Sequence, residues 1–236
     1  MEQKANKLVK GIKNYFEKNK IKNAVIGVSG GLDSAVSAYL TVKAIGNKNV
    51  TALLLPEKGV TMKKDVDDAL DLCKRLGINY KIIEINRFIE LLNSLPWQKN
   101  KIADINLRPR IRAVILYNYA NANNALVIGT SNKTELTLGY FTKYGDGACD
   151  LEVIGSLYKT EVTELARYLK LPEKIINKIP SAGLYTGQCD EKELGACYAE
   201  IDKILRSKNF SSRLGKNLLE RIKKNKHKSE LPFVVK

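Results

Sequence analysis

Apolar positions along this chain fall into two alternating patterns. Short β-branched runs, mostly ending in glycine or proline, indicate buried strands, and apolar residues three or four positions apart indicate helices. The predicted strands are 23–30, 50–56, 78–85 and 125–130. The predicted helices are 4–18, 32–45, 63–76, 86–95, 108–122, 132–138, 160–170, 190–206 and 212–225. This alternation predicts an α/β fold, with a parallel sheet flanked by helices on both faces.

The chain length of 236 residues fits a single domain, 1–236. Within it we expect a nucleotide-binding core at about 21–206 and a basic helical C-terminal segment at about 207–236. No run reaches the roughly 18 apolar residues that a membrane span requires. The charged, amphipathic N-terminus does not resemble a signal peptide. We therefore expect a cytoplasmic protein without a membrane partner.

Cysteine and histidine usage excludes several kinds of site. The four cysteines are Cys73, Cys149, Cys189 and Cys197, and His227 is the single histidine. No C-x-x-C pair exists, so the spacing of a zinc site is missing. A lone histidine also argues against a Ser-His or Cys-His hydrolase.

The formal net charge is +15, and it is unevenly distributed. Residues 203–236 contain eleven lysines and arginines against Glu220 and Glu230. Such a segment attracts anions. A solvated surface, a nucleic acid and a small polyanionic substrate all fit this charge equally well.

The sequence GVSGGLDSA (27–35) predicts a phosphate-binding loop. Glycines that follow a buried strand permit close backbone approach to a ligand, and the next helix presents its free N–H groups there. The candidate ATP-binding residues are Gly27, Val28, Ser29, Gly30, Gly31, Leu32, Asp33 and Ser34. The loop lacks the Walker A pattern. A carboxylate beside polyphosphate requires a cation, so Asp33 indicates Mg²⁺; the ordinary alternative is a helix cap.

The segment SGGLDS (29–34) resembles the pyrophosphatase loop of the N-type ATP pyrophosphatases. This resemblance implies a Rossmann-like adenine nucleotide alpha hydrolase fold. It also implies cleavage of ATP between its α and β phosphates, with adenylation of a carboxyl or carbonyl oxygen.

Further motifs follow in order: NLRPRIR, GTSNKTE, FTKYGDG, D-x₈-K and IPSAGL. Together with SGGLDS they closely resemble the NAD synthetases of the ammonia-dependent type. The resemblance implies an ATP-dependent ligase that converts the carboxylate of deamido-NAD into the amide of NAD and releases AMP and pyrophosphate. It covers the chain from the first strand to about residue 200, with a matching His-Lys near the end.

The resemblance assigns roles to individual residues. It implies that ATP is contacted by Thr130, Lys159 and Ser181. It also implies catalytic roles for Asp33 and Lys159. Glu135 is an implied second Mg²⁺ ligand beside Asp33, although Asn132 and Glu135 are also spaced as a plain capping pair. The implied deamido-NAD contacts are Arg110, Lys143, Asp150, His227 and Lys228, with Asp146 less firmly among them. Lys143 and the His-Lys pair are otherwise ordinary solvated side chains in this lysine-rich chain.

Arg108, Arg110 and Arg112 are predicted on the first turns of one helix, where spacing of two spreads them around it. Pro109 is acceptable in a first helical turn. Apolar residues of the same helix, Ile111, Val114, Ile115 and Tyr119, supply either a core face or the contact of a homodimer, which the resemblance implies.

The expected partners are ATP, deamido-NAD and free ammonia, since the chain leaves no room for a glutaminase domain; no nucleic acid is expected. Two alternatives stay open on the residues alone. One is another SGGxDS enzyme, such as a tRNA-modifying ligase, and the other is a nucleotide-binding sensor without turnover.

Overall fold

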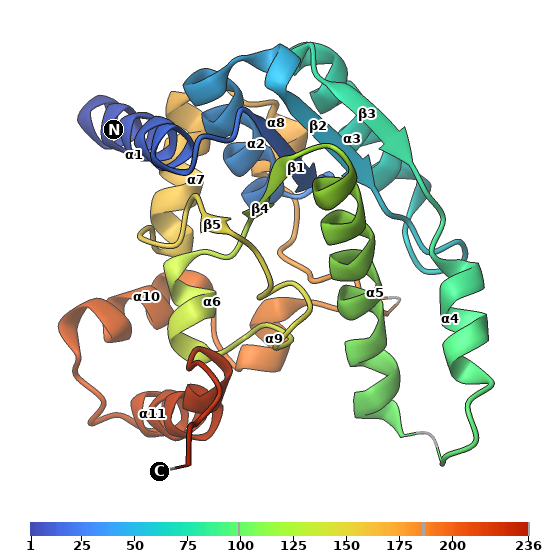
Figure 1. Cartoon of the computed structure of the whole chain (residues 1–236). Helices are drawn as coiled ribbons and strands as arrows, with labels where there is room; N and C mark the ends of the chain where they lie inside the picture. Colours follow the sequence, from blue (N-terminus) through green and yellow to red (C-terminus); the bar gives the residue numbers. More distant parts are fainter. Residues whose placement is uncertain (99, 186, 236) are drawn as a thin grey trace.

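The computed structural model describes residues 1–98, 100–185 and 187–235. Within these residues five parallel strands form one sheet, in the order β3-β2-β1-β4-β5 (Figure 1). The strands are β1 (Asn23–Gly27), β2 (Val50–Leu54), β3 (Asn79–Ile82), β4 (Ala125–Gly129) and β5 (Leu151–Glu152). The predicted α/β fold with a parallel sheet is confirmed.

The central strands form because their side chains are buried on both faces. Ala24 and Ile26 of β1 face one side and Val25 faces the other, and all three are at most 1% exposed. Such double burial selects continuous β-branched and aliphatic runs. The edge strand β3 is exposed along its length. Beyond its end, the backbone N–H groups of Ile83 and Ile85 still donate to the carbonyl oxygens of Leu54 and Pro56.

Helices cover both faces of the sheet (Figure 1). One core cluster joins the sheet to α1 (Glu2–Asn19), α2 (Leu32–Ile45), α3 (Lys63–Leu76), α7 (Lys159–Tyr168) and α8 (Glu173–Ile176). The other joins it to α4 (Asn86–Asn93) and α5 (Lys101–Ala122). A one-turn 3₁₀ helix, η1 (Asn47–Asn49), leads into β2.

A third apolar cluster lies beside this core and contains Leu138, Tyr198, Ile201 and Leu218. It joins α6 (Lys133–Leu138), α9 (Asp190–Leu194), α10 (Tyr198–Ser207) and α11 (Arg213–Asn225), after which the 3₁₀ helix η2 (Lys226–Lys228) follows. The cluster contains residues from both the predicted nucleotide-binding core, 21–206, and the predicted C-terminal segment, 207–236. The division into core and C-terminal segment stays a prediction.

Several predicted boundaries were wrong. The helix expected at 108–122 begins at Lys101, so Pro109 lies inside it rather than in its first turn. Pro109 is buried there, and Gly145 packs against it so closely that a Cβ on Gly145 would lie 2.9 Å from the proline Cβ. Tertiary packing offsets the hydrogen bond that an interior proline forfeits.

The expected helix 190–206 is two helices, because Gly195 ends α9 in a left-handed conformation. The short elements β5 and α8 were not predicted, since neither has enough residues to show a period. No helix among the described residues is long and apolar enough to cross a membrane.

Candidate active site

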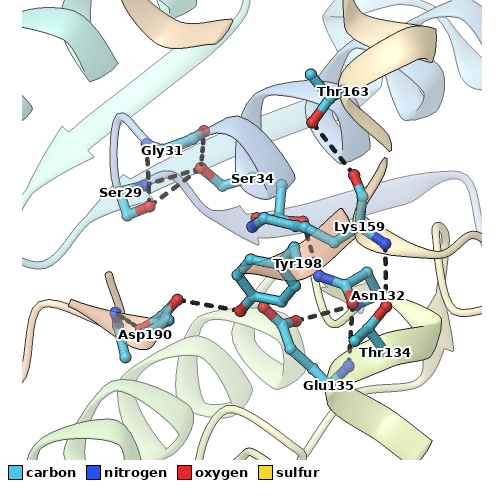
Figure 2. Close-up of polar contacts among 12 residues, drawn as sticks. Ser29, Gly31, Ser34, Asn132, Thr134, Glu135, Lys159, Thr163, Asp190 and Tyr198 are labelled. Carbon is cyan, nitrogen blue, oxygen red and sulfur yellow. Dashed lines mark hydrogen bonds and ion pairs between the residues drawn. The ribbon is translucent and has the colours of Figure 1, made fainter. Parts of the chain in front are cut away.

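The loop predicted to bind phosphate, residues 27–34, connects β1 to α2 at the carboxyl edge of the sheet. Gly30 has φ +77, and a Cβ there would overlap the backbone oxygen of Asp65, so only glycine fits. The Ser34 hydroxyl accepts from Ser29 N at 3.3 Å and donates to Gly31 O at 3.1 Å. The two serines therefore shape the loop from within (Figure 2).

Asp33 lies in the first turn of α2 and points toward α6 and α7. Its carboxylate accepts from the side-chain amide of Asn132 at 3.0 Å and forms an ion pair with the Lys159 ammonium group. The Lys159 side chain is only 6% exposed. Three elements that are distant in sequence thus meet at this carboxylate.

Glu135 meets the same asparagine from the other side. Its Oε2 accepts from Asn132 N at 3.0 Å, and Asn132 Oδ1 accepts from Glu135 N at 3.0 Å, which completes a capping box at the start of α6. The capping interpretation is therefore correct, but Asn132 also joins Glu135 to Asp33. Burial and the neighbouring charge of Asp33 raise the pKa of Glu135.

Lys159 is the cation of this cluster. Burial opposes its charge, but the carboxylates of Asp33 and Glu135 outweigh burial and raise its pKa. The Tyr198 ring lies 5.2 Å from its ammonium nitrogen, a cation–π contact. Figure 2 shows Glu135, Asn132 and Tyr198 gathered around the Lys159 side chain. One buried lysine thus pairs with Asp33 and lies within the electrostatic influence of Glu135.

A buried acid behind Lys159 was missed by sequence reasoning. Asp202 of α10 is 1% exposed and accepts from the Thr134 hydroxyl at 2.5 Å and from Thr160 N at 2.9 Å. The same Thr134 oxygen accepts from Lys159 N at 3.0 Å. This network fixes the start of α7 against α6. The sequence signal that could have indicated it is an aspartate beside the apolar helix positions Ile201 and Leu205.

Ser181 lies on an exposed segment before α9, and its flanking peptides are held by Asp190, which was also missed. Asp190 N donates to Pro180 O at 3.0 Å, and Ala182 N donates to Asp190 Oδ1 at 3.1 Å. The other Asp190 oxygen accepts from the Tyr198 hydroxyl at 3.3 Å. Asp190 thus links the Ser181 segment to the tyrosine beside Lys159.

Thr130 follows β4 directly and is half-buried at the same edge of the sheet. No hydrogen bond of its side chain occurs among the described residues. Its role in ATP binding stays a prediction.

A cavity of about 420 Å³ lies between the 139–146 loop, the 182–188 segment, α5 and α11. Lys228 and Asp146 line it, together with Arg221 and Lys224. The Lys228 ammonium group donates to Gly139 O at 2.8 Å and to Phe141 O at 2.9 Å. Burial raises the pKa of Asp146 and lowers that of Lys228.

The structure brings together some of the residues predicted to bind the dinucleotide. The Lys143 ammonium group donates to the backbone oxygen of His227 and, at 3.3 Å, to that of Glu230. Arg110 Nε donates to Lys143 O at 3.4 Å. The loop at 139–147 is therefore tied to the C-terminal segment and to α5.

Asp150 is the exception among these residues. Its carboxylate accepts from Val127 N at 2.7 Å and from the Tyr117 hydroxyl at 3.3 Å, and it has no contact with the 139–147 loop or the C-terminal segment among the described residues. Of the five predicted dinucleotide contacts only Lys228 lines the cavity. In this structure Asp150 secures β4 to α5, and its contact with a ligand stays a prediction.

The three arginines of α5 do not converge on one point, as their spacing predicted, because Arg108 and Arg112 both contact the 55–57 segment while Arg110 points toward Lys143. Arg108 pairs with Glu57 at 2.6 Å, and Arg112 Nε donates to Leu55 O at 3.0 Å. Arg110 alone of the three is exposed, so it is the one available to a ligand.

No group of three or more His, Cys, Asp or Glu side chains that could hold a metal occurs in residues 1–98, 100–185 and 187–235. The Asp33–Glu135 pair offers two carboxylates. That set fits Mg²⁺, which takes one or two carboxylates and fills its remaining positions with phosphate oxygens and water.

Comparisons with known proteins agree with this geometry. The profile of the family described as NAD synthase matches residues 4–232. An NH(3)-dependent NAD(+) synthetase of Archaeoglobus fulgidus is 48% identical over 216 residues, which cover 90% of this chain and 87% of the relative. One of Methanosarcina acetivorans is 42% identical over 249 residues, with 99% and 97% covered.

Two solved structures are also similar. The NMN synthetase of Francisella tularensis superposes with a TM-score of 0.93 at 38% identity and covers 99% of this chain and 98% of its own. The NH3-dependent NAD synthetase of Campylobacter jejuni, in complex with the nitrate ion, superposes with a TM-score of 0.82 at 36% identity, with 100% and 98% covered. The resemblance found in the sequence is confirmed: this chain belongs to the NAD synthase family.

Proposed function

We propose that this chain is an ATP-dependent ligase that amidates the nicotinate carboxylate of deamido-NAD with ammonia. The observation that carries the proposal is the meeting of Asp33, Glu135 and Lys159 around Asn132, beside a phosphate-binding loop, in a member of the NAD synthase family. Relatives that cover nearly the whole chain are named NH(3)-dependent NAD(+) synthetases, which supports ammonia as the nitrogen donor.

In the proposed reaction a carboxylate oxygen of nicotinate attacks the α-phosphorus of ATP. The bond from the α-phosphorus to the bridging oxygen breaks, and pyrophosphate leaves. Ammonia then attacks the acyl carbon of the acyl-adenylate, and AMP departs with the oxygen that was adenylated. Asp33 and Glu135 would hold Mg²⁺, which supplies positive charge to the triphosphate when bound.

The residues of the chain supply positioning and charge. The loop 27–34 presents backbone N–H groups at the start of α2, and Lys159 faces the loop as a buried cation that stabilises the pyrophosphate leaving group. Thr130 and Ser181 complete the ATP site in this proposal. The basic cavity side chains Lys228, Arg221 and Lys224 suit the diphosphate of the dinucleotide.

A mononucleotide acid is a second candidate substrate, because the structure with a TM-score of 0.93 is that of an NMN synthetase. Amidation of nicotinate mononucleotide, which lacks the adenylate half of deamido-NAD, would give NMN by the same chemistry. The dinucleotide is favoured by the higher identity, 48% and 42%, to relatives named NAD(+) synthetases.

We further propose a homodimer that uses the exposed apolar surface between α4 and α5. A groove of about 240 Å³ is lined by Phe88, Leu91, Leu92, Leu107, Arg110, Ile111, Val114 and Ile115. Ile111 belongs to the core, whereas Val114 and Leu91 are each 69% exposed. Exposed apolar patches of this kind mark interaction sites. Arg110 lines the groove and contacts Lys143 O, which supports a dimer contact near the proposed dinucleotide site. A cytoplasmic location is part of this proposal.

A single mixture tests the function. The purified protein is incubated with ATP, Mg²⁺, ammonium and either deamido-NAD or nicotinate mononucleotide. We expect NAD from the dinucleotide, with equimolar AMP and pyrophosphate, and much slower formation of NMN. A faster mononucleotide reaction would assign the second candidate. AMP release that depends on tRNA, or ATP binding without cleavage, would refute both.

A further inference from the structure

Lys178 lies directly behind the phosphate-binding loop. It follows α8 and precedes Ser181 by three residues. Its ammonium nitrogen donates to Gly30 O and to Asp65 Oδ1, each at 2.8 Å, and lies 2.8 Å from Asp68 Oδ2. The ammonium group thus has two hydrogen bonds and an ion pair with a second carboxylate, and the side chain is only 19% exposed.

The contact with Gly30 determines how one peptide of the loop is turned. The Gly30 carbonyl and the Gly31 N–H belong to the same trans peptide, so they point to opposite sides. With the carbonyl bonded to Lys178, the Gly31 N–H points to the opposite side, where it donates to Ser29 Oγ at 3.3 Å at the start of α2. That is the side on which the loop offers its donors to an anion.

The two aspartates of α3 hold Lys178 in this position. Asp68 is 2% exposed; burial opposes its charge, but Lys178 and Lys174 outweigh burial and lower its pKa. The ammonium group is thereby kept on the α3 side of the loop. It also masks a carbonyl oxygen that would repel phosphate if the peptide turned over.

We propose that Lys178 is a positioning residue for ATP: it fixes the Gly30–Gly31 peptide so that the loop presents N–H donors, and no carbonyl oxygen, to the phosphates. The inference rests on the proposed function only in taking the loop 27–34 as the ATP phosphate site. Lys178 touches no substrate in this account and acts through the backbone of the loop.

Lys174 provides a matched control. It lies four residues earlier and pairs with the same Asp68 at 2.9 Å, and with Asp71 at 2.6 Å. No contact between Lys174 and the loop occurs within the described residues. Lys174→Met therefore removes a cation from the same acidic cluster without touching the Gly30 carbonyl.

The test compares wild type with Lys178→Met, Lys178→Arg and Lys174→Met. The dissociation constant for ATP with Mg²⁺ is measured by calorimetry, and the KM values for ATP and deamido-NAD are measured by NAD formation. We expect Lys178→Met to weaken ATP binding about 10-fold or more, as loss of a hydrogen bond to a charged group does, and to change the KM for deamido-NAD less than about 2-fold. Lys178→Arg, which keeps a charged donor, should restore most of the ATP affinity.

Equal ATP affinity in Lys178→Met and Lys174→Met would overturn the inference. An equal increase in the KM values for ATP and deamido-NAD in Lys178→Met would also overturn it. Thermal unfolding of the variants separates the two effects, because a purely structural role lowers stability without a selective change for ATP. A wild-type protein that binds ATP but forms no NAD would refute the proposed function alone. One that binds no ATP would refute both.

Discussion

The carboxylate of Asp33 and the ammonium group of Lys159 form a buried ion pair between the first turns of α2 and α7. Residues 126 positions apart are thereby joined at the carboxyl edge of the sheet, where open α/β sheets bind ligands. Glu135 adds a second carboxylate through Asn132. Asp33 and Lys159 are paired as opposite charges, and Asn132 links Glu135 to this pair.

Asp33→Asn is expected to abolish Mg²⁺-dependent NAD formation while the protein stays folded. The amide has one acceptor oxygen, so it keeps only one of the hydrogen bonds from Asn132 and Lys159, and it cannot neutralise a metal ion. The free energy of unfolding should fall by about 1–3 kcal/mol, because Lys159 remains buried beside a weaker partner. Steady-state kinetics and chemical denaturation measure the two effects. Asp67→Asn, at an exposed position of α3, is the control, and near-normal turnover in Asp33→Asn would disprove the metal role.

Thr134→Val is expected to lower kcat about 10-fold or more with less effect on the KM for deamido-NAD. The isosteric change removes the hydroxyl that bonds Asp202 Oδ1 and Lys159 N, and leaves a buried acceptor short of a partner, at about 1–3 kcal/mol of stability. Thr137→Val on the same helix loses only a local bond to Lys133 O and should behave as wild type. A Thr134→Val enzyme with unchanged kcat would show that Asp202 does not position Lys159.

Glu152 makes stability depend on pH. Burial raises its pKa from 4.5 to about 7. A carboxyl group whose pKa is higher in the folded state than in the unfolded state stabilises the fold when it is protonated. This stabilisation is complete below the unfolded-state pKa and is lost as the pH rises through the folded-state pKa. The stability of wild type relative to Glu152→Gln should therefore fall between about pH 4.5 and 7, by about 3 kcal/mol, and then level off. Urea denaturation of both proteins across this range checks it, and a constant difference would contradict the raised pKa.

The double variant Leu91→Lys, Val114→Glu is expected to be monomeric in light scattering at concentrations where wild type is a dimer. Both side chains are largely exposed on the α4–α5 groove, so their replacement leaves the core intact. Met62→Lys, at an exposed apolar side chain outside the groove, is the matched control and should remain dimeric. A dimer that survives the double change would place the interface elsewhere.

Much of the fold was predictable because the central strands are buried on both faces and their helices are long enough to show a period. The predicted range 32–45 coincides with α2, and 63–76 with α3. The start of α5 was not predictable in this way, since Pro109 indicated a helix beginning there and only packing against Gly145 shows otherwise.

The candidate site was predictable where a residue type carries chemistry of its own. Asp33 and Lys159 follow from the loop and the family resemblance, and the structure brings them together. Asp190, Asp202 and Lys178 act through hydrogen bonds to other protein groups. Such contacts depend on the approach of distant helices, and no local pattern encodes them.

Transfer of oxygen-18 tests the central claim, adenylation of the nicotinate carboxylate, most directly. Deamido-NAD labelled in that carboxylate is converted with ATP, Mg²⁺ and ammonium, and the products are analysed by mass spectrometry. If the carboxylate is adenylated, AMP carries one labelled oxygen and pyrophosphate carries none. Label in inorganic phosphate, with ADP as the nucleotide product, or AMP without label, would contradict that claim.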